Sequence, residues 1–271
     1  MEVSIDNKPT VSVIMGTYNC SSTIRTAIDS IVNQSYSEWE LVICDDCSTD
    51  DTMSILSYYK SCFPNKFIIL RNDRNNKLAY SLNRCLSASR GKYIARMDGD
   101  DISEPLRLQK QVDYLETHPE VAVVGSFMSQ FDEKGLFGQI SMPEYPDSSS
   151  LLISTPFCHA TIMMRKIVYD DIGGYTVAKR TIRGQDIDLW FKFYSKGYTG
   201  YNIQEALYLV REDRNAIRRR KLKYRFLESV TRMKGYKLLG FPKSKYVYAL
   251  KPVLSFFVPV SIKRKLRKSH N

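Results

Sequence analysis

The chain has 271 residues and a mass of 31.3 kDa, enough for one large domain, or one domain with an appendage, around a sizeable core. Hydrophobic residues make up 43% and charged residues 25%, which excludes a disordered chain, a collagen-like repeat and a disulfide-dense mini-protein. The formal charge of +11 is unevenly spread: residues 1–210 hold 21 Lys and Arg against 26 Asp and Glu, whereas residues 211–271 hold 19 against 3. We therefore expect a mildly acidic domain over 1–210, followed over 211–271 by a basic, aromatic-rich helical tail that needs an anionic partner.

The first ten residues are polar and no stretch reaches the ~20 apolar residues of a membrane-spanning helix. We therefore expect a cytoplasmic protein whose six cysteines are free thiols. Cys44 and Cys47 form a C-x-x-C pattern, but two aspartates separate them and no second cysteine pair completes a zinc site. The pattern favours a buried strand residue and a turn residue over a redox or metal role.

Apolar segments of two kinds alternate along the first 125 residues. The short apolar runs that predict strands are 11–15, 41–44, 67–70, 93–95 and 121–124. Helical spacing predicts helices that start near residues 24, 51, 78 and 105. Buried strands separated by helices indicate an α/β fold with a mostly parallel sheet covered on both faces.

After residue 125 the alternation loosens. We expect irregular strands and loops over 127–146, a strand over 159–165 and a helix from about residue 187. From about residue 216, a helical stripe runs among many Lys and Arg side chains: Leu222, Phe226, Val230 and Met233.

Polar loops follow the predicted strands, at the sheet edge where ligands bind in parallel sheets. Asp98, Asp100 and Asp101 come directly after a strand, and carboxylates at alternate positions can converge on one hard divalent cation together with diphosphate oxygens. Gly99 allows the tight curvature that this requires. The same residues also suit a turn whose acidic side chains favour the start of the next helix.

Two further acidic segments allow both a functional and a structural role. Asp45 and Asp46 follow the second strand, where one of them could accept a hydrogen bond from a base N–H or both could lie in a solvated turn. Asp50 suits a helix cap. Asp186 lies at a predicted helix start, where it could be an N-cap or a base for a substrate hydroxyl. Asp188 suits a structural role in the first turn of that helix.

The order of these motifs resembles the family 2 glycosyltransferases with a GT-A fold, especially bacterial enzymes of surface-polysaccharide (O-antigen or capsule) assembly. The resemblance covers roughly residues 9–211, and its matching pieces are 11–19, 45–50, 82–83, 91–101, 159, 173–175 and 185–190. It implies a Rossmann-like sheet flanked by helices. It also implies inverting transfer of a hexose or N-acetylhexosamine from a UDP-sugar with Mn²⁺ or Mg²⁺.

The resemblance implies a nucleotide-sugar site made of six residues from three loops: Thr17, Tyr18, Asn19, Asp46, Asp98 and Gly99. Asp46 would accept the uracil N–H, and Asp98 would lie by the ribose and the metal. Asp100 would be the principal metal ligand. Asp186 would be the catalytic base that deprotonates the acceptor hydroxyl.

Several positions depart from the family pattern. Lys77 and Cys85 stand where glycine is frequent, and Glu212 and Asp213 stand where a histidine is frequent, so no third metal ligand is assigned from that loop. The Q-x-x-R-W signature of processive synthases is absent, which favours addition of one sugar per encounter. His159 matches a family position and is expected to be structural.

The basic segments 218–225 and 263–268 flank an aromatic, apolar stretch that includes Phe256 and Phe257. They predict attachment to the anionic inner face of the cell membrane. The family resemblance implies lipid-diphosphate-linked saccharide acceptors, which would lie at that surface. The alternatives are a solvated helical face, or a nucleotide- or nucleic-acid-binding protein acting through this tail, although no nucleic-acid-binding motif accompanies the charge. A dinucleotide-dependent oxidoreductase is disfavoured because residues 16–20 lack the G-x-G-x-x-G pattern.

Overall fold

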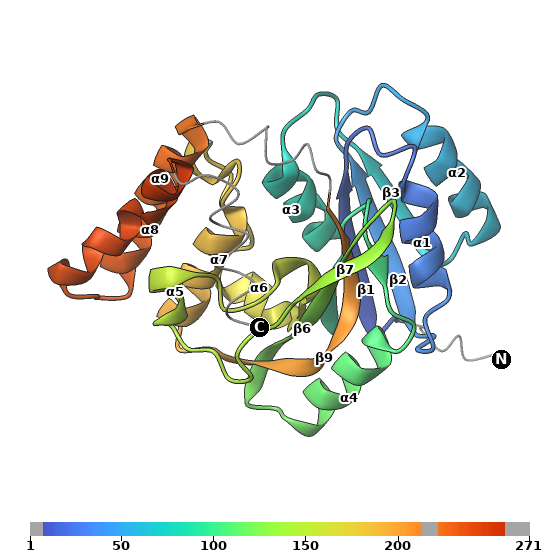
Figure 1. The fold of residues 1–271 in the computed structure, drawn as a ribbon. Helices are drawn as coiled ribbons and strands as arrows, with labels where there is room; N and C mark the ends of the chain where they lie inside the picture. Colours follow the sequence, from blue (N-terminus) through green and yellow to red (C-terminus); the bar gives the residue numbers. More distant parts are fainter. Residues whose placement is uncertain (1–7, 213–221, 258–271) are drawn as a thin grey trace.

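The computed structural model describes residues 8–212 and 222–257. Nine strands of these residues form one sheet in the order β3-β2-β1-β4-β8-β6-β9-β5, with β7 paired to β6 (Figure 1). Their bounds are β1 Val11–Thr17, β2 Trp39–Asp45, β3 Phe67–Arg71, β4 Tyr93–Arg96, β5 Ile102–Ser103, β6 Val121–Asp132, β7 Gly135–Ile140, β8 Met163–Arg165 and β9 Thr199–Arg211. The pairs β3-β2, β2-β1, β1-β4 and β6-β9 are parallel, and the pairs made by β8, β7 and β5 are antiparallel.

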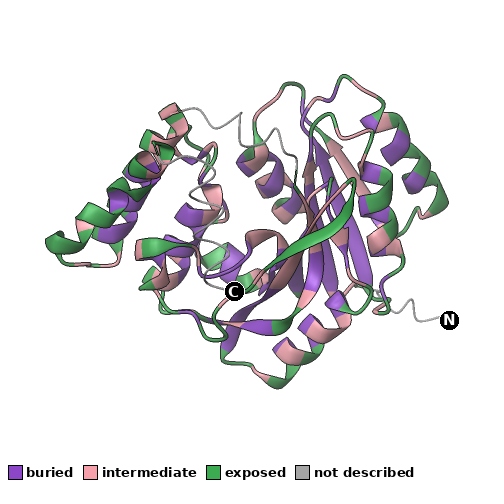
Figure 2. Cartoon of the chain, viewed as in Figure 1, coloured by how far each residue is buried: buried purple, intermediate pink, exposed green. Residues whose placement is uncertain are grey.

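Helices cover both faces of the sheet (Figures 1 and 2). One face packs against α1 (Ile24–Val32), α2 (Thr52–Cys62) and α4 (Arg107–Thr117). The other packs against α3 (Leu78–Ala88), α6 (Lys166–Asp171) and α7 (Gln185–Ser195). This arrangement confirms the expected α/β fold with a mostly parallel sheet.

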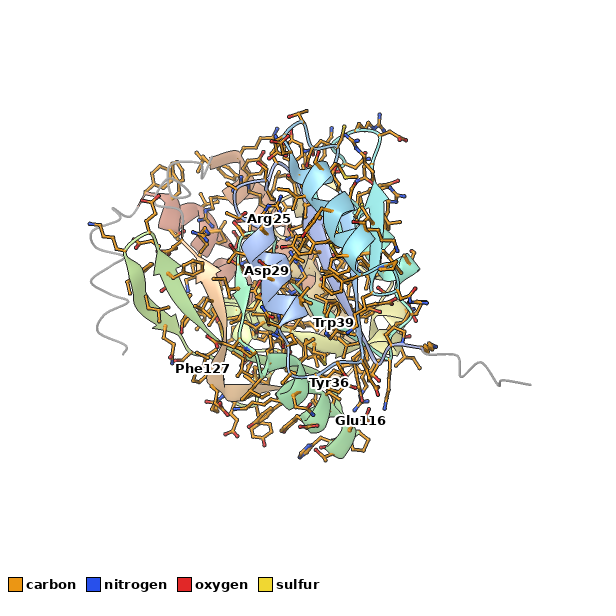
Figure 3. All side chains as sticks on the ribbon, turned by 90° about the vertical axis from the view of Figure 1, so that its right-hand side faces the viewer. Arg25, Asp29, Tyr36, Trp39, Glu116 and Phe127 are labelled. Carbon is orange, nitrogen blue, oxygen red and sulfur yellow. The ribbon has the colours of Figure 1, made fainter. Side chains whose placement is uncertain are left out.

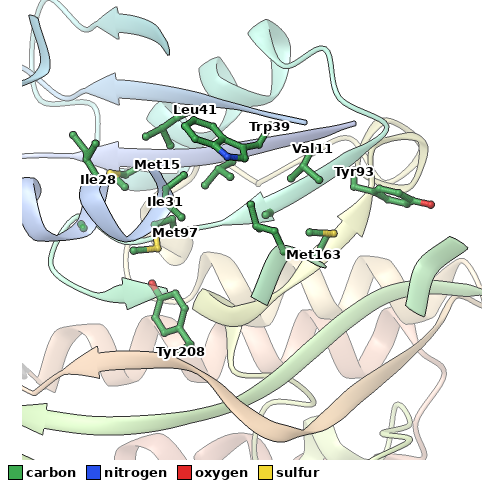
Figure 4. Packing of buried hydrophobic residues seen from close by; sticks show 14 of the residues in the cluster. Val11, Met15, Ile28, Ile31, Trp39, Leu41, Tyr93, Met97, Met163 and Tyr208 are labelled. Atoms are coloured by element: carbon green, nitrogen blue, oxygen red, sulfur yellow. The ribbon is translucent and has the colours of Figure 1, made fainter. Parts of the chain in front are cut away.

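The amphipathic pattern of α1 shows why the sequence folds this way. Its residues at positions 24, 27, 28 and 31 are fully buried and pack with Met15 and Leu41 of the sheet (Figure 4). Arg25 and Asp29 lie on its exposed side (Figure 3), and Asp29 Oδ1 accepts a hydrogen bond of 2.5 Å from Tyr59 of α2. The helix therefore buries its apolar face against the sheet, and its polar face hydrogen-bonds to α2.

The second half of the sheet agrees with the expectation in part. The irregular strands and loops expected over 127–146 are present: β6 continues to Asp132 with a register shift between Gln130 and Phe131, and it turns into β7. A long parallel pairing with β9, which the sequence analysis did not predict, supports this extension. The predicted strand over 159–165 was wrong in its first part. Residues His159–Thr161 form the 3₁₀ turn η1, and only β8 is extended.

The C-terminal helices α8 (Leu222–Leu238), η3 (Lys243–Leu250) and α9 (Lys251–Phe256) lie at one end of the molecule beside α7 (Figure 1). The domain boundary near residue 210 stays a prediction. Of the two basic segments, residues 218–221 and 263–268 lie outside the described residues. Among the helices of residues 8–212 and 222–257, none combines the length and apolarity that crossing a bilayer requires.

Candidate active site

The sheet register places the ends of three parallel strands side by side. Thr17 at the end of β1 is opposite Asp45 at the end of β2, and the Asp46 N–H donates to the Thr17 carbonyl at 2.8 Å. On the other side of β1, the Met97 N–H donates to the Ile14 carbonyl at 3.1 Å. The loops after β1, β2 and β4 therefore meet at the carboxyl edge of the sheet, as the motif order predicted.

The turn after β4 packs closely on the loop after β1. Thr23 Oγ1 donates to the Gly99 carbonyl at 2.9 Å. A Cβ at Gly99 would lie 3.2 Å from Ile24 Cδ1 and 3.5 Å from Thr17 Cγ2, so glycine allows this close approach. Burial raises the pKa of the neighbouring Cys20 thiol to about 11, and the charges of Asp100, Asp50 and Asp98 add to this shift.

Asp98, Asp100 and Asp101 form the acidic turn. Partial desolvation and the negative charge of Asp98 raise the pKa of Asp100, although part of this residue stays exposed at the surface. Burial raises the pKa of Asp101 more strongly, with further contributions from Asp98 and Asp100, although its Oδ1 accepts a hydrogen bond of 2.8 Å from the Arg211 N–H. Three carboxylates so close together favour a compensating positive charge.

The donor chemistry of this turn fits a hard divalent cation such as Mg²⁺ or Mn²⁺, because its donors are carboxylate oxygens. Within residues 8–212 and 222–257, no group of three or more Cys, His, Asp and Glu side chains is arranged as a complete metal site. Mg²⁺ is commonly held by one or two carboxylates together with substrate phosphates and water. Asp98 and Asp100 are suited to that mode of binding.

Asp98 is positioned by two residues that the sequence analysis did not single out. Arg96, which is only 2% exposed, places its Nη2 atom 2.5 Å from Asp98 Oδ1. Tyr208 of β9 accepts a hydrogen bond of 3.1 Å from the Asp98 N–H, and its ring points toward Met97 (Figure 4). A buried arginine has no signature in a pattern of apolar spacing, and Tyr208 lies on the strand that was not predicted.

Asp46 is buried and anchors the loop before α3. Its Oδ1 accepts hydrogen bonds from Asn72 Nδ2 at 2.7 Å and from the Asn76 N–H at 2.8 Å, and its Oδ2 accepts one from the Lys77 N–H at 2.9 Å. A carboxylate oxygen can accept two hydrogen bonds, so Oδ2 keeps capacity for one more. The expected contact of Asp46 with a uracil stays a prediction.

The loop after β1 is fixed to the loop after β2. The Asn19 N–H donates to Ser48 Oγ at 2.9 Å, and Asn19 Oδ1 accepts a hydrogen bond of 2.9 Å from the Thr49 N–H. These bonds hold Asn19 at a φ of 52°. The preceding residue, Tyr18, is 47% exposed beside this fixed loop, where an aromatic ring is free to contact a ligand.

Asp186 lies in the first turn of α7 and is partly buried. Desolvation raises the pKa of its carboxyl, and a hydrogen bond from the Ile187 N–H lowers it. On α8, the charge of Glu228 raises this pKa further and the charge of Arg232 lowers it. Asp188, two residues further along α7, forms an ion pair with Arg180 instead. The two aspartates therefore have different partners, and Asp186 is the one without a neighbouring cation in direct ion-pair contact within the described residues.

Tyr175 is a buried residue beside His159. Burial raises the pKa of its hydroxyl well above the usual value, and the charges of Arg96 and Asp186 act on it with opposite signs. The same hydroxyl lies 2.9 Å from His159 Nε2. Burial, with Arg96, lowers the pKa of His159 to about 3, which agrees with the expected structural role of this histidine.

Comparison with known proteins agrees with this geometry. The family model described as "Glycosyl transferase family 2" matches residues 12–173. EpsE of Bacillus subtilis, which is named as a glycosyltransferase, is 45% identical over 264 residues, covering 97% of this chain and 95% of EpsE. WfaP of Escherichia coli, named as a UDP-Glc:α-D-GlcNAc-diphosphoundecaprenol β-1,3-glucosyltransferase, is 30% identical, covering 71% of this chain and 73% of WfaP.

Solved structures share the fold at low sequence identity. TarS of S. aureus in complex with UDP-GlcNAc superposes with a TM-score of 0.68 at 18% identity, covering 91% of this chain and 71% of TarS. The mannosyltransferase PcManGT of Pyrobaculum calidifontis, in complex with GDP-Man and Mn²⁺, has a TM-score of 0.64 at 17% identity, covering 97% of this chain and 80% of PcManGT. These likenesses show a GT-A fold. With the family match and the identity to EpsE, they show that the chain belongs to glycosyl transferase family 2 and is a glycosyltransferase.

Proposed function

We propose that the chain is an inverting, metal-dependent, non-processive glycosyltransferase. It transfers a hexose or N-acetylhexosamine from a UDP-sugar to a saccharide on a lipid diphosphate, during polysaccharide assembly at the inner face of the cell membrane. The observation that carries the proposal is the meeting of the Asp98–Asp100 turn with the ends of β1 and β2. The activity for which WfaP is named and the UDP-GlcNAc complex of TarS support the choice of donor and acceptor.

Binding of the donor is assigned to the three loops at the carboxyl edge of the sheet. Thr17, Tyr18 and Asn19 border the nucleoside, and Asp46 accepts the uracil N–H. Asp98 and Asp100 would hold the divalent cation, and Gly99 between them lets their turn pack closely on the loop after β1. A cation at this position stabilises the charge that develops on a nucleoside diphosphate leaving group.

Asp186 acts as the base for the acceptor hydroxyl. It accepts the proton as the hydroxyl oxygen attacks the anomeric carbon from the face opposite the diphosphate, so the configuration inverts in one displacement. Its raised pKa makes the carboxylate a stronger proton acceptor than an ordinary aspartate. The charge of Glu228 on α8 adds to this rise, and the charge of Arg232 opposes it.

The assignment of Asp100 is tested by substitution with Asn, which keeps the shape and removes the charge. We expect Asp100→Asn to lose Mn²⁺-dependent UDP binding in calorimetry and to lose transfer. Asp113→Asn is the matched control, because the exposed Asp113 side chain on α4 accepts a hydrogen bond from Gln109 of the same helix. Unchanged Mn²⁺-dependent UDP binding by Asp100→Asn would reject the metal assignment.

A release assay addresses the substrates. UDP release is measured across a panel of UDP-sugars with a lipid-diphosphate N-acetylglucosamine acceptor, and GDP-mannose is included because PcManGT holds that donor. We expect a UDP-sugar to be used and a short DNA duplex to bind no more tightly to the protein than competing polyanions do. Selective binding of the duplex would favour the alternative function through the basic tail.

A further inference from the structure

The helix α8 carries apolar side chains on its solvent face. Phe226, Val230 and Met233 are 54%, 42% and 39% exposed and lie at i, i+4 and i+7, so they form one stripe along the helix. Figure 2 shows the outer side of α8 as exposed and the side toward α7 as buried. Exposed apolar residues that line up in this way mark an interaction surface more often than scattered ones do.

The opposite face of α8 is polar and fixed in place. Arg232, which is 5% exposed, donates from Nη1 to the Leu151 carbonyl at 2.7 Å, and Thr231 Oγ1 donates to the Arg180 carbonyl at 3.2 Å. Gly235 lies against Phe191 of α7 so closely that a Cβ would come within 2.1 Å of the ring. The helix therefore cannot turn its apolar stripe inward without losing these contacts.

The charges beside the stripe are all positive. Lys223, Lys234 and Lys237 are exposed on the same side of α8, and no ion pair within the described residues involves them. Between residues 222 and 257 there are eight Lys and Arg but a single acidic residue, Glu228, which is paired with Arg225 and Arg232. An anionic partner complements this surface.

We propose that the docking face, defined as Phe226, Val230, Met233, Lys223, Lys234 and Lys237, binds the surface of an anionic lipid bilayer. Apolar side chains between lysines match a bilayer surface, where the former enter the headgroup region and the latter reach anionic headgroups. Association of two such faces from two copies would oppose lysine to lysine, which disfavours a dimer through this face.

This inference rests on one part of the proposed function, the lipid-linked acceptor. It adds which surface of the enzyme contacts the membrane. The docking face and the pair Glu228–Arg232 lie on opposite sides of α8, and the charges of that pair act on Asp186. The face of α8 opposite the docking face packs on α7, which carries Asp186. An acceptor whose lipid lies in the bilayer at the docking face would therefore reach across α8 to the proposed base.

Flotation of the full chain with lipid vesicles tests the docking face without depending on catalysis. We expect the protein to float with vesicles containing phosphatidylglycerol and to stay unbound with pure phosphatidylcholine. Phe226→Ser/Val230→Ser/Met233→Ser should lower the partition coefficient by more than about a hundredfold. Lys234→Gln and Lys237→Gln should each lower it by about fivefold.

The matched control is Leu136→Ser/Phe137→Ser, which makes the same kind of change on the exposed strand β7 and should float like the parent. UDP binding is measured for every variant, so a lost donor site is told apart from a lost docking face. Full flotation of the triple variant, equal binding to neutral vesicles, or no binding by the parent would each overturn the proposal. So would concentration-dependent association with an acidic protein in place of vesicles.

Discussion

The buried guanidinium of Arg96 and the carboxylate of Asp98 form an ion pair of 2.5 Å beneath the acidic turn. Burial would lower the pKa of Arg96, but Asp98, Tyr175 and Tyr208 together outweigh burial and raise it. A second nitrogen of the same guanidinium donates to the Met97 carbonyl. Arg96 therefore fixes the side chain of Asp98, which is proposed to hold the donor and the metal, together with the carbonyl of the preceding residue.

We predict that Arg96→Met weakens both the fold and donor binding. Removing one partner of a buried pair costs about 3 kcal/mol of unfolding free energy, at the low end of the usual range because Asp98 is about one-third exposed. Urea unfolding measures this loss, and calorimetry with UDP and Mn²⁺ measures the loss of affinity. Lys92→Met removes an exposed pair with Glu116 and should cost less than about 1 kcal/mol. Equal costs for the two variants would contradict the role of Arg96.

Asp186 and Asp188 give a matched pair of substitutions with opposite expected effects on stability. The folded protein raises the pKa of Asp186, so its ionisation at neutral pH costs folding free energy, and Asp186→Asn should raise the Tm while abolishing transfer. Asp188→Asn leaves Arg180 without its carboxylate and should lower the Tm. Both variants should still bind UDP. Thermal unfolding and a UDP-release assay separate these outcomes.

The gain from Asp186→Asn should depend on pH in a defined direction. Because the pKa is higher in the folded than in the unfolded chain, the unfolding free energy falls as pH rises from the unfolded value of 3.8 through the folded value. The Tm difference between Asp186→Asn and the parent should therefore be largest at neutral pH and vanish near pH 3.8. A difference that is constant with pH would contradict the raised pKa.

The sequence predicted the carboxylates of the site because they follow strands whose apolar runs are unmistakable. It did not predict β9, since a fully buried amide interrupts its apolar pattern: Asn202 donates to the Pro143 carbonyl at 2.8 Å and to the Pro156 carbonyl at 3.1 Å. Tyr208 and Arg211, which support the acidic turn, were therefore missed with the strand.

The apolar stripe of α8 was also visible in the sequence, but its direction was not. Periodicity predicts that Phe226, Val230 and Met233 share a face, and it cannot say whether that face turns inward. The close contact between Gly235 and Phe191 decides the question, because it brings the other face of α8 against α7. Packing between residues far apart in the chain is the part of the fold that a local pattern does not contain.

We predict that Lys77→Gly stabilises the protein. Lys77 has a φ of 74° and a ψ of 164°, a conformation that favours glycine, and its N–H is held by Asp46. Glycine should relieve about 1 kcal/mol of strain and raise the Tm by about 3 °C. Lys77→Ala is the control, since alanine removes the long side chain but keeps the Cβ and the strain. A rise in Tm with alanine as large as that with glycine would contradict this explanation.

The packing of α8 on α7 is tested by Gly235→Ala. The added Cβ would come within 2.1 Å of the Phe191 ring, so the two helices must separate, at a cost of about 3 kcal/mol. Gly138→Ala is the control, because its Cβ would meet only the flexible end of Gln130 at 2.9 Å.

Phe191→Ala should cost stability on its own, yet in the double variant the clash disappears. The losses of unfolding free energy in Gly235→Ala and Phe191→Ala should therefore sum to more than the loss in the double variant. If urea unfolding shows that the two losses simply add, this contact does not orient α8.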